Sequence, residues 1–172
     1  CACHFINLSL RIITYEGNAK KNKPASPVFP AWKKLLKIVS KLHVAPLLME
    51  ELRTLVSESA KVQKRPVPAM PSHFVATRWL STFNTGRTCL VVRGSLDRLV
   101  SRHGRDYDLE QLSTTEWTII EGTCKLIEPF ASLSTYLEGE KYITASSMLA
   151  EFGIACFEAF ILKGGKVKDF FN

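Results

Sequence analysis

Apolar residues recur at intervals of three and four along most of this chain, and clusters of proline and glycine separate the segments that carry them. Such spacing places the apolar side chains of a segment on one face of a helix. With 46% hydrophobic residues among 172, the chain can also bury a core. We therefore predict an all-α fold, an irregular array of about six helices. The first covers residues 2–15, where the spacing also suits a strand, and the last is capped at Thr144.

The clearest helical faces lie in the first half of the chain. One helix is predicted to begin near Pro30, with apolar residues on one face and lysines largely around the other. A second is predicted from Pro46, because proline is tolerated in the first helical turn. Three prolines within residues 63–73 then predict a linker, since proline removes a hydrogen-bond donor and favours extended conformations before it. The two apolar faces comprise Trp32, Leu35, Leu36, Val39 and Leu42, and Leu48, Leu52, Leu55 and Val56.

Two further helices are predicted in the second half. The apolar spacing indicates one long helix from Trp79 to Val100, with a weak point at Gly86. Ser113 and Glu116 have the spacing of a capping box, in which each side chain accepts a hydrogen bond from the backbone of the other, so a helix should begin there. Pro129 is expected to kink or restart that helix.

Charge is distributed unevenly along the chain. Residues 1–105 contain 18 Lys and Arg against 5 Asp and Glu, whereas residues 106–172 contain 5 against 11. A basic surface attracts polyphosphates because binding releases condensed counterions. The basic half therefore favours a nucleic acid as partner, although a solvated charged surface explains the same distribution.

The cysteines indicate the redox compartment of the protein, and the longest apolar stretches indicate whether it spans a membrane. Five cysteines are odd in number and scattered, which favours a reducing compartment, and three of them fall within helical patterns as small hydrophobic residues. No apolar stretch reaches the roughly 18 residues that would span a bilayer, so we expect no membrane partner. The chain begins with Cys rather than Met, and we interpret it as a fragment. The cysteines are Cys1, Cys3, Cys89, Cys124 and Cys156.

Cys1 and His4 are the first candidate functional residues, because thiolate and imidazole are zinc ligands. A structural zinc site needs two more ligands, and the remaining histidines, His43, His73 and His103, are isolated from one another. We therefore expect no complete zinc site in this chain. Cys–His nucleophilic catalysis is also disfavoured, because no third group orients the pair. The residues alone favour a helical turn packed against a neighbouring domain.

Thr77, Arg78 and Trp79 are the second candidates. An arginine can hold a phosphate with two hydrogen bonds, and an adjacent indole offers a face on which an unstacked base can rest. The alternative is a buried tryptophan that begins a helix and an arginine that caps a neighbouring one. A third group of candidate DNA contacts is the cationic side of the helix near Pro30, with Lys33, Lys34 and Lys37.

Taken together and in this order, the motifs resemble the middle of hAT-family transposases and of host proteins derived from them, which often carry BED zinc fingers. Cys1, His4, Asn7 and Leu8 match one family motif, and residues 77–79 match the other. Residues 112–144 are similar to the family's later helical stretch. Where the family usually has Trp-Asn-Ser-Thr-Tyr, this chain has Trp79-Leu80-Ser81-Thr82-Phe83, which lacks the Asn amide and the Tyr hydroxyl.

The resemblance implies a domain organisation and roles for the two motifs. Residues 1–16 would end a ribonuclease-H-like core and lead into a helical insertion domain, which residues 17–172 cover incompletely, with a proline-rich linker at 63–76. In the family an Arg-Trp pair stabilises an extruded base while a DNA end folds into a hairpin. Arg78 would then contact phosphate and Trp79 the base, while Cys1 and His4 would support the active site.

The same resemblance limits what this chain can do alone. The family's Asp-Asp-Glu set holds two divalent metal ions, implied to be Mg²⁺, for phosphoryl transfer. These acids lie outside the matched segment, so we assign no catalytic residue, metal ligand or cofactor here and expect the isolated chain to be inactive. The implied partners are transposon-end DNA and further copies of the full-length protein, in the nucleus. The alternatives are a domesticated nuclear dimerisation or regulatory module without catalytic activity, and an unrelated helical adaptor.

Overall fold

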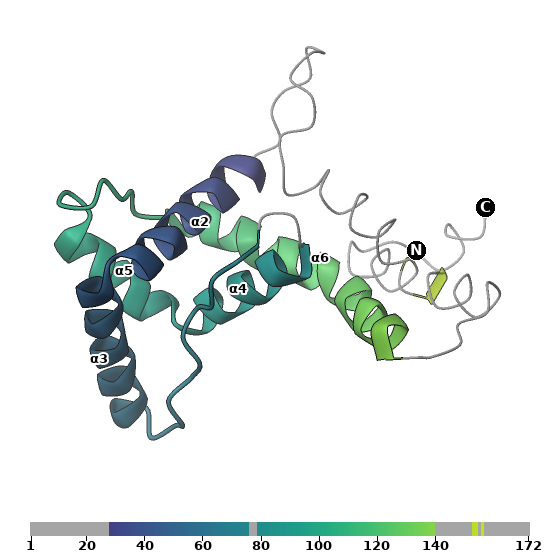
Figure 1. Ribbon diagram of the computed structural model, residues 1–172, viewed down its shortest axis with the longest axis horizontal. Helices are drawn as coiled ribbons and strands as arrows, with labels where there is room; N and C mark the ends of the chain where they lie inside the picture. The colour runs from purple at the N-terminus through teal and green to yellow at the C-terminus, as the bar shows by residue number, and fades with distance from the viewer. Residues whose placement is uncertain (1–27, 76–78, 140–152, 155, 157–172) are drawn as a thin grey trace, which may run out of the picture.

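The computed structural model describes residues 28–75 and 79–139, together with residues 153, 154 and 156. The described residues form five numbered helices and contain no strand, which confirms the all-α prediction. The helix predicted over residues 2–15 and most of the one predicted from Thr144 lie outside this part of the chain. The five are α2 (Val28–Val44), α3 (Pro46–Val62), α4 (Trp79–Val91), α5 (Arg93–His103) and α6 (Thr114–Gly139) (Figure 1).

Helix α6 is the longest and packs against α2 and α4, while α3 packs against α2 and α5. In Figure 1, α3 and α5 lie side by side at one end, and α6 extends past α4 at the other. A continuous set of buried apolar side chains joins the five helices. None of the helices in the described part combines the length and apolar character that crossing a membrane requires.

The predicted faces of α2 and α3 are buried. Trp32 is 1% exposed and lies with the other α2 face residues in the core, except for Leu36, which is partly buried. All four residues predicted for the α3 face are buried. Pro46 occupies the first turn of α3 as predicted, where it removes no intrahelical hydrogen bond.

Helix α3 ends before the prolines of the linker, and backbone hydrogen bonds close its last turn. The Lys64 N–H donates to the Lys61 carbonyl at 3.1 Å, and the Arg65 N–H donates to the Ala60 carbonyl at 3.1 Å. Lys64 has a φ of 49°, in the left-handed region. This is the Schellman arrangement, with lysine at the position where glycine is most common. Residues 65–75 then contain no regular secondary structure, so the predicted break in the helix is present.

The single helix predicted from Trp79 to Val100 is wrong. The structure has two helices, α4 and α5, which meet at Val92 rather than at Gly86. Val92 has φ −101° and ψ 14°, outside the helical range, and its buried side chain joins the core. Two β-branched residues followed closely by Gly94 weaken the helix at this point. The change of direction lets α4 pack on α6 and α5 pack on α3.

Gly86 has a packing role instead. A Cβ atom built there would lie 2.4 Å from Trp32 Cη2 and 3.3 Å from Cys124 Sγ. Glycine therefore allows the backbone of α4 to approach the α2 indole.

The start of α6 confirms the predicted capping box. The Ser113 N–H donates to Glu116 Oε2 at 2.8 Å, and the Glu116 N–H donates to Ser113 Oγ at 3.2 Å. Of the two outcomes predicted at Pro129, a kink or a restart, the restart does not occur, because α6 continues through Pro129 to Gly139. A proline within a helix removes one backbone donor, and the long helix, buried on α2 and α4, tolerates that loss.

The cysteines of the core behave as predicted. Cys89 and Cys124 are buried and carry free thiols, and Cys156 is partly buried. Burial raises the pKa of both the Cys89 and the Cys124 thiol to about 12. These two thiols are therefore protonated packing groups at neutral pH.

Candidate nucleic-acid interface

The Thr-Arg-Trp motif stands at the junction between the linker and α4. Trp79 is the first residue of α4, and the side chain of Trp79 lies outside the described part. Thr77 and Arg78 are also outside it, as are Cys1 and His4. What the structure gives is the setting of this motif: the linker before it and the helix after it.

Hydrogen bonds join the linker, which precedes the motif, to residues of α4 that follow the motif. The Val75 N–H donates to Ser81 Oγ at 2.9 Å, and the Thr85 hydroxyl, which donates to the Ser81 carbonyl at 2.9 Å, lies 3.4 Å from the Ser72 carbonyl. Pro71 is buried, and Met70 packs against the core. The two ends of the short segment that contains Thr77 and Arg78 are thus both anchored to the helical body.

The residues that follow Trp79 serve the fold. Phe83 is 2% exposed and belongs to the core, with the Arg87 guanidinium 5.7 Å from its ring centroid. Thr82 is also buried, and Ser81 receives the linker hydrogen bond. A tyrosine hydroxyl at position 83 would need a buried partner, so phenylalanine suits this environment.

Lys34 and Lys37 of α2 project towards carboxylates of the α5–α6 loop and of the first turn of α6. Lys34 Nζ lies 2.9 Å from Glu116 Oε1 and 3.3 Å from Glu110 Oε2. Lys37 Nζ lies 2.7 Å from Asp108 Oδ2. Lys33 is exposed on the same helix. Lys34 and Lys37 therefore already have carboxylate partners.

These ion pairs shift the pKa values of Lys34 and of the carboxyl groups of Glu116 and Asp108. Hydrogen bonding to Glu116 raises the pKa of Lys34. The Ser113 backbone N–H, followed by Lys34, lowers the pKa of Glu116, and Lys37 lowers the pKa of Asp108. A phosphate that approached Lys34 or Lys37 would have to replace a carboxylate, which reduces the net gain from binding.

A second group of cations was missed by the sequence reasoning. From Ser59 to Leu96 the chain contains no Asp or Glu but six Lys and Arg. Three of them, Lys61, Lys64 and Arg65, are exposed at the end of α3. No carboxylate in the described part forms a salt bridge with these three. The absence of acidic residues over this stretch was the signal that could have identified them. The six are Lys61, Lys64, Arg65, Arg78, Arg87 and Arg93.

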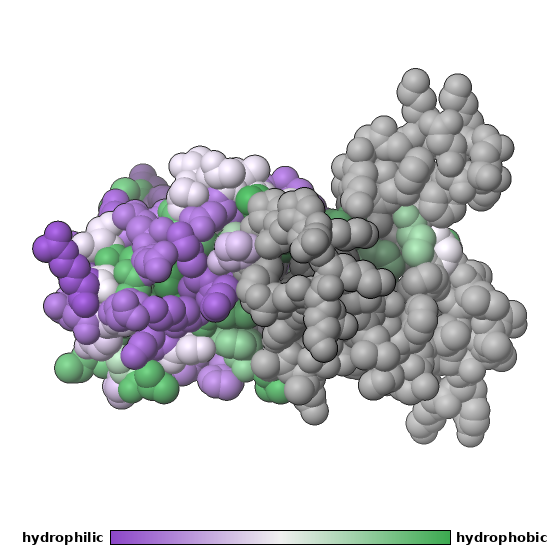
Figure 2. Space-filling view, turned by 90° about the horizontal axis from the view of Figure 1, so that it is seen from above, coloured by the Kyte–Doolittle hydropathy of each residue, from purple (hydrophilic) through white to green (hydrophobic). Residues whose placement is uncertain are grey.

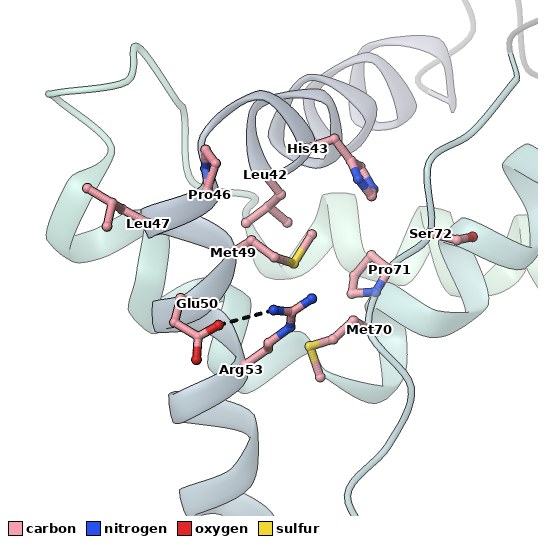
Figure 3. Close-up of a pocket in the computed structure, with 10 residues that line it drawn as sticks. All are labelled: Leu42, His43, Pro46, Leu47, Met49, Glu50, Arg53, Met70, Pro71 and Ser72. Carbon is pink, nitrogen blue, oxygen red and sulfur yellow. Dashed lines mark hydrogen bonds and ion pairs between the residues drawn. The ribbon is translucent and has the colours of Figure 1, made fainter.

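A groove of about 640 Å³ opens where the end of α2, the start of α3 and the linker meet (Figure 3). Its lining is largely apolar, and an ion pair between Arg53 Nη1 and Glu50 Oε2, 3.1 Å apart, lies within it (Figure 3). The lining residues are Leu42, His43, Pro46, Leu47, Met49, Glu50, Arg53, Met70, Pro71 and Ser72.

His43, beside this groove, contacts His73 of the linker, with ring centroids 5.3 Å apart at an interplanar angle of 69°. The view that the histidines are isolated from one another is therefore wrong for this pair, because the linker folds back onto the end of α2. Among the residues that the structure describes, no group of three or more His, Cys, Asp or Glu side chains could hold a metal ion.

On the face shown in Figure 2, hydrophilic residues predominate over the described part, and apolar residues show as smaller areas between them. Such a surface suits contact with water or with a charged partner better than a large apolar interface.

Comparison with known proteins identifies one curated protein of similar sequence. No protein-family model and no solved structure matches the chain. Among curated proteins, the "Putative AC transposase" of Zea mays is 30% identical over 148 residues. The chain is similar in sequence to a transposase. The match covers 85% of this chain and 16% of the maize protein, so the chain spans a small part of its relative's length.

Proposed function

We propose that this chain is a DNA-binding helical segment of a hAT transposase-like protein and assists hairpin-forming transposition in the full-length parent. The observation that carries the proposal is the similarity to the maize transposase, which extends over 85% of the chain. In the proposed organisation, residues 1–16 end a ribonuclease-H-like core and residues 17–172 belong to the insertion domain. The segment binds transposon-end DNA in the nucleus, as part of a homo-oligomer.

Charge supports DNA as the partner. The stretch without acidic residues, Ser59 to Leu96, covers the end of α3, the linker and α4. No acidic residue occupies the first turn of α4, where the helix dipole favours a negative group. The Arg78 guanidinium, next to this helix end in sequence, is suited to a DNA phosphate.

The resemblance assigns the roles within the motif. Arg78 contacts phosphate, Trp79 stacks on an extruded base, and Thr77 lies beside them at the DNA. The hydrogen bond from Val75 to Ser81 supports this assignment, because it joins the described residues on either side of the motif. Cys1 and His4 support an active site whose acids, and the divalent metal they hold, belong to other parts of the parent. No step of the reaction is assigned to the described residues.

A fluorescence-anisotropy titration with labelled duplex DNA at several salt concentrations tests DNA binding. The affinity of the chain should fall as salt rises, and the slope of log affinity against log salt should shrink when Lys33, Lys34 and Lys37 are changed to Gln. Affinity that does not respond to salt, or an absence of binding at low salt, would contradict the proposal.

The role of Trp79 is tested in the full-length parent protein. Trp79→Ala should reduce hairpin formation more than it reduces DNA affinity, because the indole is proposed to act on the extruded base. Hairpin yield equal to that of the unsubstituted protein would remove this role.

A further inference from the structure

We infer that the exposed cations at the end of α3, namely Lys61, Lys64 and Arg65, form the main phosphate-contacting surface of the described part. We call these three residues the α3-end cluster. The inference rests on the proposed DNA-binding function and names residues that neither the resemblance nor the Thr-Arg-Trp motif identifies.

Local charge distinguishes the α3-end cluster. The cluster places three cations within five residues of sequence, and all three are exposed. Glu58 is the nearest acidic residue along the chain, and no salt bridge joins it to Lys61. A cation without a carboxylate partner binds phosphate with release of counterions and without the loss of an existing ion pair.

Lys64 has an unusual backbone conformation for a lysine. Its φ of 49° is adopted at lower cost by glycine or asparagine. The turn itself is made by backbone hydrogen bonds from Lys64 and Arg65 to α3 carbonyls, and these do not require a lysine side chain. An unfavourable residue at such a position is a reason to look for a function of its side chain. The Schellman turn also fixes the backbone of the cluster at the end of a packed helix.

The lysines of α2 differ from the α3-end cluster in having carboxylate partners. Lys34 and Lys37 lie at 2.9 Å and 2.7 Å from carboxylates of Glu116 and Asp108. Phosphate binding there exchanges one anion for another, whereas binding at the α3-end cluster adds an anion where none is present. The α3-end cluster should therefore contribute more to the salt dependence of binding than the two α2 lysines.

Paired variants of the 172-residue chain separate these surfaces. K61Q/K64Q/R65Q should reduce the magnitude of the salt slope by about 2 to 3, since each phosphate contact contributes about 0.9. The comparison variant K34Q/K37Q removes two cations instead of three; two full phosphate contacts would contribute about 1.8, and we expect its slope to fall by less than about 1. A third variant, Lys64→Gly, should weaken DNA binding severalfold while its resistance to urea increases, so lost affinity cannot be attributed to unfolding.

The outcomes distinguish this inference from the function on which it rests. Salt-dependent binding by the unsubstituted chain, with an unchanged slope in K61Q/K64Q/R65Q, would overturn the α3-end cluster and leave DNA binding in place. A larger effect of K34Q/K37Q than of K61Q/K64Q/R65Q would also overturn it. If the unsubstituted chain does not bind DNA at low salt, both the inference and the proposed function fail.

Discussion

Replacing Gly86 by alanine tests the packing of α4 against α2. The new methyl carbon would lie 2.4 Å from Trp32 Cη2 and 3.0 Å from Trp32 Cζ3. Carbon atoms in contact are normally about 3.5–4.0 Å apart, so the indole or the helix must move by about 1 Å. Trp32 is fully buried between elements of the core, and Cys124 Sγ stands 3.3 Å from the same methyl position. Both neighbours are buried side chains of the core.

Two opposing effects decide whether Gly86→Ala raises or lowers the free energy of unfolding. Alanine in a helix interior is more favourable than glycine by about 0.5–1 kcal/mol. Overpacking of a dense core costs about 1–3 kcal/mol. The clash is close and the neighbour is a large rigid ring, so the upper part of that range applies. Gly86→Ala should therefore lower the free energy of unfolding by about 1–2 kcal/mol.

Urea denaturation followed by far-UV circular dichroism measures this difference, with Gly122→Ala as the matched control. Nothing lies within 4 Å of a Cβ atom at Gly122 in α6, so alanine there should stabilise the protein by up to about 1 kcal/mol. The reasoning is refuted if Gly86→Ala stabilises the protein as much as Gly122→Ala does.

Three other predictions follow from local contacts. Ser113→Ala should lower the free energy of unfolding by about 1 kcal/mol because it removes the cap of α6; unchanged stability would mean that the cap is not used. Because the folded-state pKa of Glu116 lies below the ordinary value of 4.5, its carboxylate stabilises the fold above that value and loses this contribution as the pH falls through the folded pKa. Stability of the unsubstituted chain should thus fall more steeply between pH 6 and 3 than that of Glu116→Gln, and parallel curves would exclude this effect. Because their pKa is raised to about 12, Cys89 and Cys124 should react with iodoacetamide at pH 8 only after denaturation, as peptide mass spectrometry can check. Rapid reaction in the folded protein would show that the two thiols are accessible.

Features set by nearby residues were predictable from the sequence. The buried face of α2, with Trp32 and Leu42, follows from apolar spacing alone, because burial of one face dominates helix stability. The capping box of α6 involves only Ser113 and Glu116, three residues apart. The start of α3 at Pro46 is equally local.

Features that depend on residues far apart in the sequence could not be predicted from the sequence. The apolar spacing continues through Val92, so only packing on two different helices shows that the chain turns there. Lys34 and Glu116 are far apart in sequence, and their ion pair exists because α2 packs along α6. Lys64 adopts a conformation that its side chain does not favour, so the residue type gave no sign of the turn.

Lysine acetylation with and without duplex DNA, read out by peptide mass spectrometry, tests the central claim most directly. The account predicts that bound DNA slows modification of Lys61 and Lys64. Lys125 of α6, whose Nζ lies 2.7 Å from Glu121 Oε1, should be modified at the same rate in both samples. If DNA is bound and the modification rates of Lys61 and Lys64 do not change, the end of α3 does not contact DNA.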